Sequence, residues 1–305
     1  NFQQLIIDLT GMDIANASLL DEATAAAEAV GLSQRLDKNN SKKIFVSSSC
    51  NPQTIDLIKT RTEPFGLELI IGDEKNDLQK IKENIVCGVL SYPGTLGDIQ
   101  DPSESISQIH KKKGKAILVC DLLALTRLKT PAELGADIAV GSAQRFGIPM
   151  GYGGPHAAFF ATKEEFKRSM PGRIIGVSVD RHGKKAYRLS LQTREQHIRR
   201  DKATSNICTA QALLAIISAA FAMYHGPEGL IKIANRTSTL AKLFADEIKK
   251  ANFKILSDYF FDTVTIITKS KTDEIYQNAQ REGINLRKVD KGNLSVAFDE
   301  AKKLD

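Results

Sequence analysis

The first half of the chain alternates between short apolar runs and longer stretches with helical patterning. Runs rich in β-branched residues predict six strands, at 44–47, 67–71, 86–90, 117–120, 138–140 and 157–160. Helices are predicted between most of them, over 52–62, 76–83 and 102–112. Strands that alternate with helices form right-handed βαβ units, so the sequence predicts an α/β protein with a mainly parallel sheet.

A smaller unit follows this large domain. Beyond residue 210 the pattern predicts two long helices with Gly226 and Pro227 between them. Strands are then predicted at 253–256, 263–268, 285–289 and 294–298, with a helix over 273–281. We therefore expect a large domain over 1–215 and a small α/β domain over 216–305. Both ends fall close to patterned segments, so we expect truncation at both ends and an incomplete small domain.

Composition excludes several classes of function. The net charge is +6, but the aromatic fraction is only 6% and no nucleic-acid-binding motif is present, so no nucleic-acid partner is expected. No apolar run is long enough to cross a bilayer, so no membrane is expected. The four cysteines form no CxxC pair, which favours buried free thiols in a reducing compartment and no metal site: Cys50, Cys87, Cys120 and Cys208.

The predicted order of elements suggests one enzyme class in particular. In the fold-type I enzymes of pyridoxal 5'-phosphate (PLP), a helix start binds the phosphate, an Asp follows one strand and a Lys follows a later strand. The corresponding positions here are the helix start at 18–23, Asp121 and the turn at 141–146. Ser18 and Asp21 form a capping-box pattern, which predicts that the helix begins near Ser18. Spacing alone leaves other α/β proteins open.

Three long segments make the comparison specific. They are NASLLDEATAAAEA at 16–29, the run 141–161 with GYGGPHAAFF at 151–160, and LQTREQHIRRDKATSNICT at 191–209. All three are similar to the N-terminal half of the glycine decarboxylases, the P-proteins of the glycine cleavage system. The resemblance covers essentially the whole chain. It implies a fold-type I PLP-transferase-like fold with a mainly parallel large domain and a smaller C-terminal α/β domain.

The resemblance also implies an activity for the complete protein. Such a protein is a glycine dehydrogenase (aminomethyl-transferring), an oxidoreductase of glycine catabolism. Glycine loses carbon dioxide on PLP, and the aminomethyl group passes to the lipoyl arm of the H-protein. The implied partners are the complementary C-terminal half or subunit, the lipoylated H-protein and glycine. We expect a bacterial cytoplasmic protein, with the mitochondrial matrix as the alternative for a eukaryotic source.

The cofactor positions depart from those of the catalytic half. In the family the Schiff-base lysine belongs to the C-terminal half, and here Gln144 stands at its position. The resemblance therefore implies no catalytic residue in this chain and PLP in the complementary half. Asp21 and Glu22 add two carboxylates to the first helical turn, where they would repel a phosphate by about 4 kcal/mol each. Asp121 is either a remnant of the pyridinium partner or a cap of its own turn.

Other residues are candidates for a role at the partner's cofactor. By resemblance, three are expected to contact the PLP phosphate of the complementary half: Thr204, Ser205 and Asn206. Four more are expected at the interface or along the tunnel to that cofactor: His156, His197, Arg199 and Arg200. The glycine-rich stretch 147–155 lacks the Lys-Ser/Thr ending of a P-loop and is expected to pack beside the same interface. The alternative for the run 194–202 is a solvated charged face.

Two other functions stay open from the sequence. One is a self-sufficient fold-type I PLP enzyme, such as an aminotransferase or decarboxylase, against which the missing lysine at Gln144 argues. The other is a non-enzymatic scaffold built on the same fold. Cofactor absorbance would favour the first, and copurification without a lysine-bearing half would favour the second.

Overall fold

The computed structural model describes residues 1–191, 196, 198–203, 207 and 210–303. They form two compact units, one of residues 1–92 and 102–226, the other of residues 93–101 and 227–305. The predicted boundary between 215 and 216 falls inside α5 (Ala212–Lys250), which is broken instead at Gly226. Gly226 has φ 64° and ψ 177° and precedes Pro227. A residue before proline avoids helical backbone and glycine tolerates positive φ, so the break occurs here.

The first unit is built on a seven-stranded sheet in the order β1-β7-β6-β5-β4-β2-β3. From β3 to β6 the neighbouring strands pair in parallel, and β7 and β1 are added antiparallel. The bounds are β1 (Ile14–Ala15), β2 (Lys43–Ser47), β3 (Glu68–Gly72), β4 (Ile85–Tyr92), β5 (Lys115–Cys120), β6 (Ile138–Ser142) and β7 (Ala158–Thr162). All six predicted strands lie in this sheet, which confirms the α/β class.

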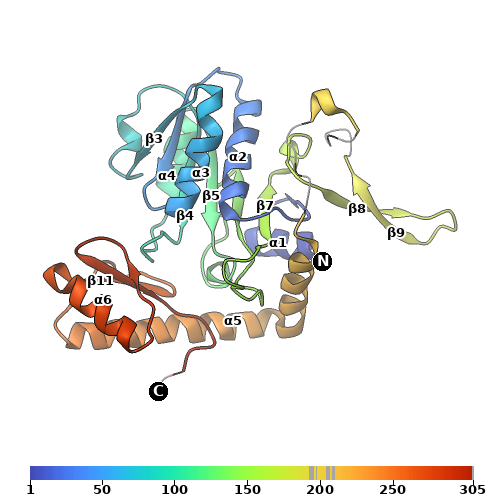
Figure 1. Cartoon of the computed structure of the whole chain (residues 1–305). Coiled ribbons are helices and arrows are strands. Elements are labelled where there is room, and N and C mark those ends of the chain that lie inside the picture. Colours follow the sequence, from blue (N-terminus) through green and yellow to red (C-terminus); the bar gives the residue numbers. More distant parts are fainter. Residues whose placement is uncertain (192–195, 197, 204–206, 208–209, 304–305) are drawn as a thin grey trace. The chain divides into compact units, whose positions relative to one another are not determined.

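Helices cover both faces of the sheet (Figure 1). On one face α2 (Glu22–Leu36) packs against β4 to β7 and against α3 (Pro52–Thr62). Alternate strand residues such as Cys87 and Val89 belong to the core on this face. Between them Gly88 points the opposite way, where a Cβ would overlap Ile109 of α4 (Ser103–Lys111). The strands are therefore buried on both sides, as parallel sheets are.

Two sequence-based helix predictions were wrong, and side chains explain both. Residues 76–83 contain only the 3-10 turn η2 (Leu78–Lys80), because the carboxylates of Asp73 and Asp77 accept nearby backbone N–H groups and favour turns. The helix predicted from Ser18 begins at Glu22, with Asp21 as N-cap accepting from the Thr24 amide at 2.7 Å. Ser18 is buried with φ 139° instead.

A two-stranded hairpin that the sequence analysis did not predict leaves the sheet of the first unit. It pairs β8 (Ile174–Val179) with β9 (Lys185–Ser190) in antiparallel register. Figure 1 draws it as a ribbon that projects beside α1 (Phe2–Thr10) and the first half of α5. Strand period two places Ile175, Val177 and Val179 on one face, and all three are exposed.

The second unit is a four-stranded antiparallel sheet with helix α6 (Thr272–Arg281). The strands are β10 (Lys254–Ile255), β11 (Thr263–Ile267), β12 (Arg287–Lys288) and β13 (Asn293–Ala297), in the order β10-β11-β13-β12. Residues 93–101 belong to it: the Leu96 carbonyl accepts from the Thr265 hydroxyl at 2.7 Å, and Asp98 bridges to Phe260. The sequence predicted a small unit with a helix and strands, but it did not predict that residues 93–101 belong to this unit.

One helix, α5, is long and apolar enough for a comparison with membrane-spanning helices. By length and composition alone α5 could cross a bilayer, a test that core helices of soluble proteins also pass. The break at Gly226 leaves a first part shorter than the roughly 20 residues a span requires. The second part is charged, with Lys249 and Lys250 in its last turn. The absence of a membrane partner stays a prediction.

Candidate functional site

Two neighbouring strands bring together Asp121 and the turn at 141–146, two of the positions that were compared with the fold-type I enzymes. Asp121 directly follows β5, and Ser142 ends the parallel neighbour β6. At Gly141 an added Cβ would overlap the carbonyl oxygen of Cys120, so only glycine lets the two strand ends approach this closely. In open α/β sheets ligands bind outside the carboxyl ends of the strands, which makes this edge the candidate site.

An ion pair closes the centre of this edge. The Nε of Arg145 lies 2.9 Å from Oδ2 of Asp121, and the two side chains are only 23% and 28% exposed. The other carboxylate oxygen, Oδ1, accepts from the Ala124 amide at 2.8 Å. Both oxygens of Asp121 therefore have partners from this chain, so it caps its own turn and also neutralises a guanidinium.

Gln144 lies in the turn between the same elements. Its backbone N–H donates to Ser142 Oγ at 3.1 Å, and the same hydroxyl lies 3.2 Å from Nδ1 of His156. The half-buried Gln144 side chain carries an amide, which donates and accepts hydrogen bonds but supplies no amine nucleophile. The structure thus brings His156 into the site, while its role at an interface or tunnel stays a prediction.

The start of α2 is the third position that was compared with the fold-type I enzymes, where the phosphate binds. Asp21 caps the helix, so its carboxylate takes a backbone N–H that a phosphate would use elsewhere. Glu22 accepts from Asn51 Nδ2 and from Thr54 Oγ1, both at 2.9 Å. Burial raises the pKa of Glu22, these two hydrogen bonds lower it, and the charges of Asp121 and Asp21 raise it further.

These residues do not fit PLP, the cofactor that the resemblance implies for the family. Gln144 offers no amine. The carboxylate of Asp121 is already engaged by Arg145 and by the Ala124 amide. Asp21 and Glu22 place carboxyl groups where a phosphate dianion would need bare backbone N–H groups. No reaction step at this edge of the sheet follows from these groups.

Several candidates from the sequence fall elsewhere. Four of them lie outside the described residues: His197, Thr204, Ser205 and Asn206. Arg199 and Arg200 are described and exposed. In the glycine-rich stretch Tyr152 is fully exposed, flanked by glycines of positive φ at 151 and 153. The interface roles of these residues stay predictions.

The cysteine expectation is tested at three positions. Cys50, Cys87 and Cys120 are free and buried, as expected, and burial raises the pKa of all three thiols. Cys208 lies outside the described residues. Within the described part of the chain, no group of three or more His, Cys, Asp and Glu side chains is placed to hold a metal ion.

An apolar groove was missed by the sequence analysis. It has a volume of about 810 Å³ and is bounded by α1, the β8–β9 hairpin and the first half of α5. Its most exposed apolar residues are Val177 at 65%, Tyr187 at 68%, Ile216 at 63% and Met223 at 62%. The alternation in IIGVSV at 174–179 was the signal that could have revealed the exposed strand face.

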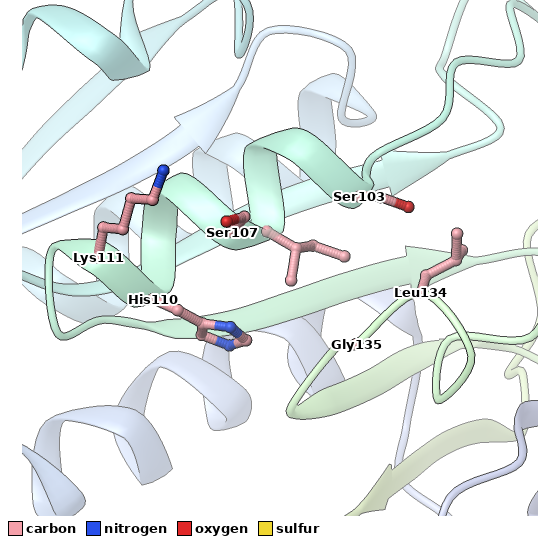
Figure 2. Close-up of a pocket in the computed structure, with 7 residues that line it drawn as sticks. Ser103, Ser107, His110, Lys111, Leu134 and Gly135 are labelled. Carbon is pink, nitrogen blue, oxygen red and sulfur yellow. The ribbon is translucent and has the colours of Figure 1, made fainter.

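A second hollow, of about 460 Å³, lies beside α4 and the turn at Leu134 and Gly135. Figure 2 shows the Lys111 ammonium and the His110 ring extending from the helix in different directions, so the two side chains do not converge on one ligand. His110 Nε2 instead lies 2.8 Å from the carboxylate of Asp137. This hollow therefore carries a structural contact and no built binding site.

A family model and two curated relatives match this chain. A model of the family described as "Glycine cleavage system P-protein" matches residues 1–305. The chain is 72% identical over 304 residues to a glycine dehydrogenase (decarboxylating) of Pelagibacter ubique, and 53% identical over 305 residues to that of Photobacterium profundum. Both matches take in 100% of this chain but only 32% and 31% of the relatives, so the chain spans about a third of their length.

Solved structures share the fold. A glycine decarboxylase (P-protein) crystallised in inhibitor-bound form matches with a TM-score of 0.91 and 32% identity, over 99% of this chain and 71% of that chain. A cysteine desulfurase from Thermococcus onnurineus matches with a TM-score of 0.67 at 14% identity, which shows the fold alone. The match with this chain spans 71% of the crystallised chain but about a third of each curated relative. The crystallised chain is therefore less than half as long as the curated relatives.

Proposed function

Since the chain belongs to the glycine cleavage system P-protein family, we propose that it forms the cofactor-free half of a PLP-dependent glycine decarboxylase. The complete protein decarboxylates glycine and transfers the aminomethyl group to the lipoyl arm of the H-protein. PLP lies in a complementary, lysine-bearing half. That half is either a further part of one long polypeptide or a separate subunit, since relatives of both lengths match.

The observation that supports a non-catalytic role is the set of side chains at the ends of β5 and β6. Gln144 stands where the fold's enzymes carry their lysine, and Arg145 pairs with Asp121 at 2.9 Å. A strand edge with no amine, an engaged aspartate and carboxyl groups at the helix start has none of the groups that hold PLP in this fold. The chemistry of the complete protein therefore takes place elsewhere.

The apolar groove supports pairing with the complementary half. A two-stranded hairpin is marginally stable alone in water, yet β8 and β9 expose Val177, Val179 and Tyr187 to solvent. Ile216 and Met223 extend the apolar surface along α5. A contiguous surface of this kind marks an interaction site, and the curated relatives hold two further thirds of chain that can cover it.

Seven further residues take their proposed roles from the family. Thr204, Ser205 and Asn206 reach the PLP phosphate of the complementary half, and four residues line the interface or tunnel. Those four are His156, His197, Arg199 and Arg200. His156 lies beside Ser142 in the first unit, which supports its share of the proposal.

Reconstitution tests the proposal. The 305-residue chain is mixed with the C-terminal two thirds of the Pelagibacter ubique relative, made as a separate polypeptide. We expect a stable complex that binds PLP and releases carbon dioxide from glycine in the presence of lipoylated H-protein. The complementary polypeptide alone is expected to be much less active. Decarboxylation by the 305-residue chain alone, with PLP bound to its own lysines, would disprove the proposal.

A matched pair of variants tests the surface. Val177→Glu combined with Ile216→Glu places two charges in the groove and should weaken the complex at least about tenfold, as loss of a central apolar contact does. Phe65→Glu makes the same kind of change at an apolar residue that is 61% exposed on η1 (Glu63–Phe65) and should leave assembly intact. Equal binding by all three proteins would exclude the groove as the interface.

A further inference from the structure

Asp121 and Arg145 hold together two strand ends that are distant in sequence. Asp121 follows β5 and Arg145 follows β6, and the pair joins them through the 2.9 Å contact between Oδ2 and Nε. Both side chains are less than a third exposed, so the pair is only partly screened by water. A half-buried ion pair of this kind fixes the geometry of the edge on which the fold's enzymes build their cofactor site.

A second acid lies close to the pair. Asp121 and Glu22 lie near enough for each charge to affect the other, and burial already raises the pKa of Glu22. Within the described residues, two neutral donors hold Glu22, the Asn51 amide and the Thr54 hydroxyl. Arg145 is the cationic side chain that the described structure sets against Asp121.

In the fold-type I enzymes an aspartate after this strand faces the protonated ring nitrogen of PLP. The ring nitrogen and a guanidinium share the relevant chemistry, since both are planar, cationic N–H donors. Arg145 occupies the turn that follows β6, next to Gln144 at the lysine position, and its Nε meets the same carboxylate.

We propose that the Arg145 guanidinium is a built-in substitute for the cofactor's ring nitrogen, which neutralises Asp121 so that this edge of the sheet is complete without a ligand. The position of the cofactor rests on the proposed function, whereas the ion pair and its charge balance stand without it. Removing the guanidinium takes the cationic partner away from Asp121 and frees the space that the planar group filled, which suits a small planar cation. Methylguanidinium has the size, shape and charge for that site.

A double-mutant cycle tests the charge balance on the full 305-residue chain. Arg145→Ala should lower the midpoint of thermal unfolding by about 2–8 °C, since it leaves Asp121 partly buried and unpaired. Asp121→Asn with Arg145→Ala should lose less than the sum of the two single losses, because removing both partners leaves no uncompensated charge. Arg188→Ala, at an exposed arginine of β9, controls for the loss of one positive charge and should have no measurable effect.

Chemical rescue tests the substitute itself. Millimolar methylguanidinium chloride should restore most of the lost midpoint in Arg145→Ala, compared with sodium chloride at equal concentration. It should not stabilise the wild-type chain, nor the variant that also carries Asp121→Asn. If Arg145→Ala alone fails to fold, the double variant should still fold, because it lacks the unpaired acid.

Two outcomes would overturn the proposal. Additive losses in the double variant would mean that the two side chains do not depend on one another. Equal stabilisation by methylguanidinium with and without Asp121 would mean that the cation acts elsewhere. Neither measurement involves the complementary half, so failure here and failure of the reconstitution above are separate results.

Discussion

The ammonium group of Lys163 lies 2.6 Å from the buried carboxylate of Asp137, so the residue after β7 is joined to the residue before β6. His110 approaches the other oxygen at 2.8 Å, and the Ala116 amide donates to it at 2.9 Å. Burial alone would raise the pKa of Asp137, but these donors more than offset it and hold the pKa at about 2.

This contact predicts acid sensitivity. Because the folded-state pKa lies below the usual value of about 3.9, Asp137 contributes stability above pH 4, and that stability is lost as pH falls towards 2. The contribution at neutral pH is about 2 kcal/mol. Asp137→Asn should lower the unfolding midpoint at pH 7 and flatten its decline between about pH 5 and pH 2. Parallel pH profiles for variant and wild type would contradict this assignment.

A lysine at the family position should not restore the cofactor site. Gln144→Lys supplies an amine, but Asp121 remains paired with Arg145, and Asp21 and Glu22 still meet the phosphate. The chain with this substitution is expected to show no absorbance of PLP bound at position 144 and no glycine decarboxylation. Borohydride reduction followed by peptide mass mapping measures where PLP attaches. Stoichiometric labelling at position 144 would refute the prediction, whereas scattered labelling of exposed lysines would not.

Tight packing at Gly97 predicts a specific loss of stability. Gly97 has φ 91°, and a Cβ there would overlap the Thr263 carbonyl group within the second unit. Gly283 belongs to the same unit and has φ 73°, but nothing lies within 4 Å of its Cβ position. Both alanine substitutions incur backbone strain, so Gly97→Ala should cost about 1–3 kcal/mol more than Gly283→Ala. Equal denaturant midpoints for the two variants would show that the loop at 93–101 accommodates the added methyl group without loss of stability.

The basic pair on the segment after β9 tests the proposed interface. Arg199→Glu with Arg200→Glu should impair assembly with the complementary half, measured by copurification and glycine turnover. Lys111→Glu with Lys113→Glu reverses two exposed charges on and beyond α4 and serves as the matched control. Normal assembly of the first double variant would mean that the run is only a solvated face.

The sequence predicted the parallel sheet because its strands are buried on both faces and read as unbroken apolar runs. Strands such as β4 and β5 carry almost no polar residue, so no other element fits them. The β8–β9 hairpin was missed because its apolar face is exposed and a glycine interrupts the run, which weakens the strand signal. The helix over 76–83 failed because Asp73 and Asp77 compete for backbone N–H groups.

At the candidate site, too, the sequence predicted some features and not others. The positions of Asp121 and Gln144 were predicted from order along the chain, since strand succession alone brings them to one edge. The contact between Asp121 and Arg145 depends on the register of β5 against β6, which no local pattern encodes. The engagement of Glu22 by Asn51 and Thr54 likewise depends on where two helices begin beside one another. Such pairings follow from tertiary structure.

The excursion of residues 93–101 into the second unit has a consequence for synthesis on the ribosome. Leu96 and Asp98 leave the exit tunnel long before Phe260 and Thr265, with which they pair. At roughly 5–20 residues per second, the nascent segment waits on the order of ten seconds for its partners. The first unit can close around its sheet in that time, whereas the second cannot, so vectorial synthesis imposes an order of folding that refolding from denaturant does not.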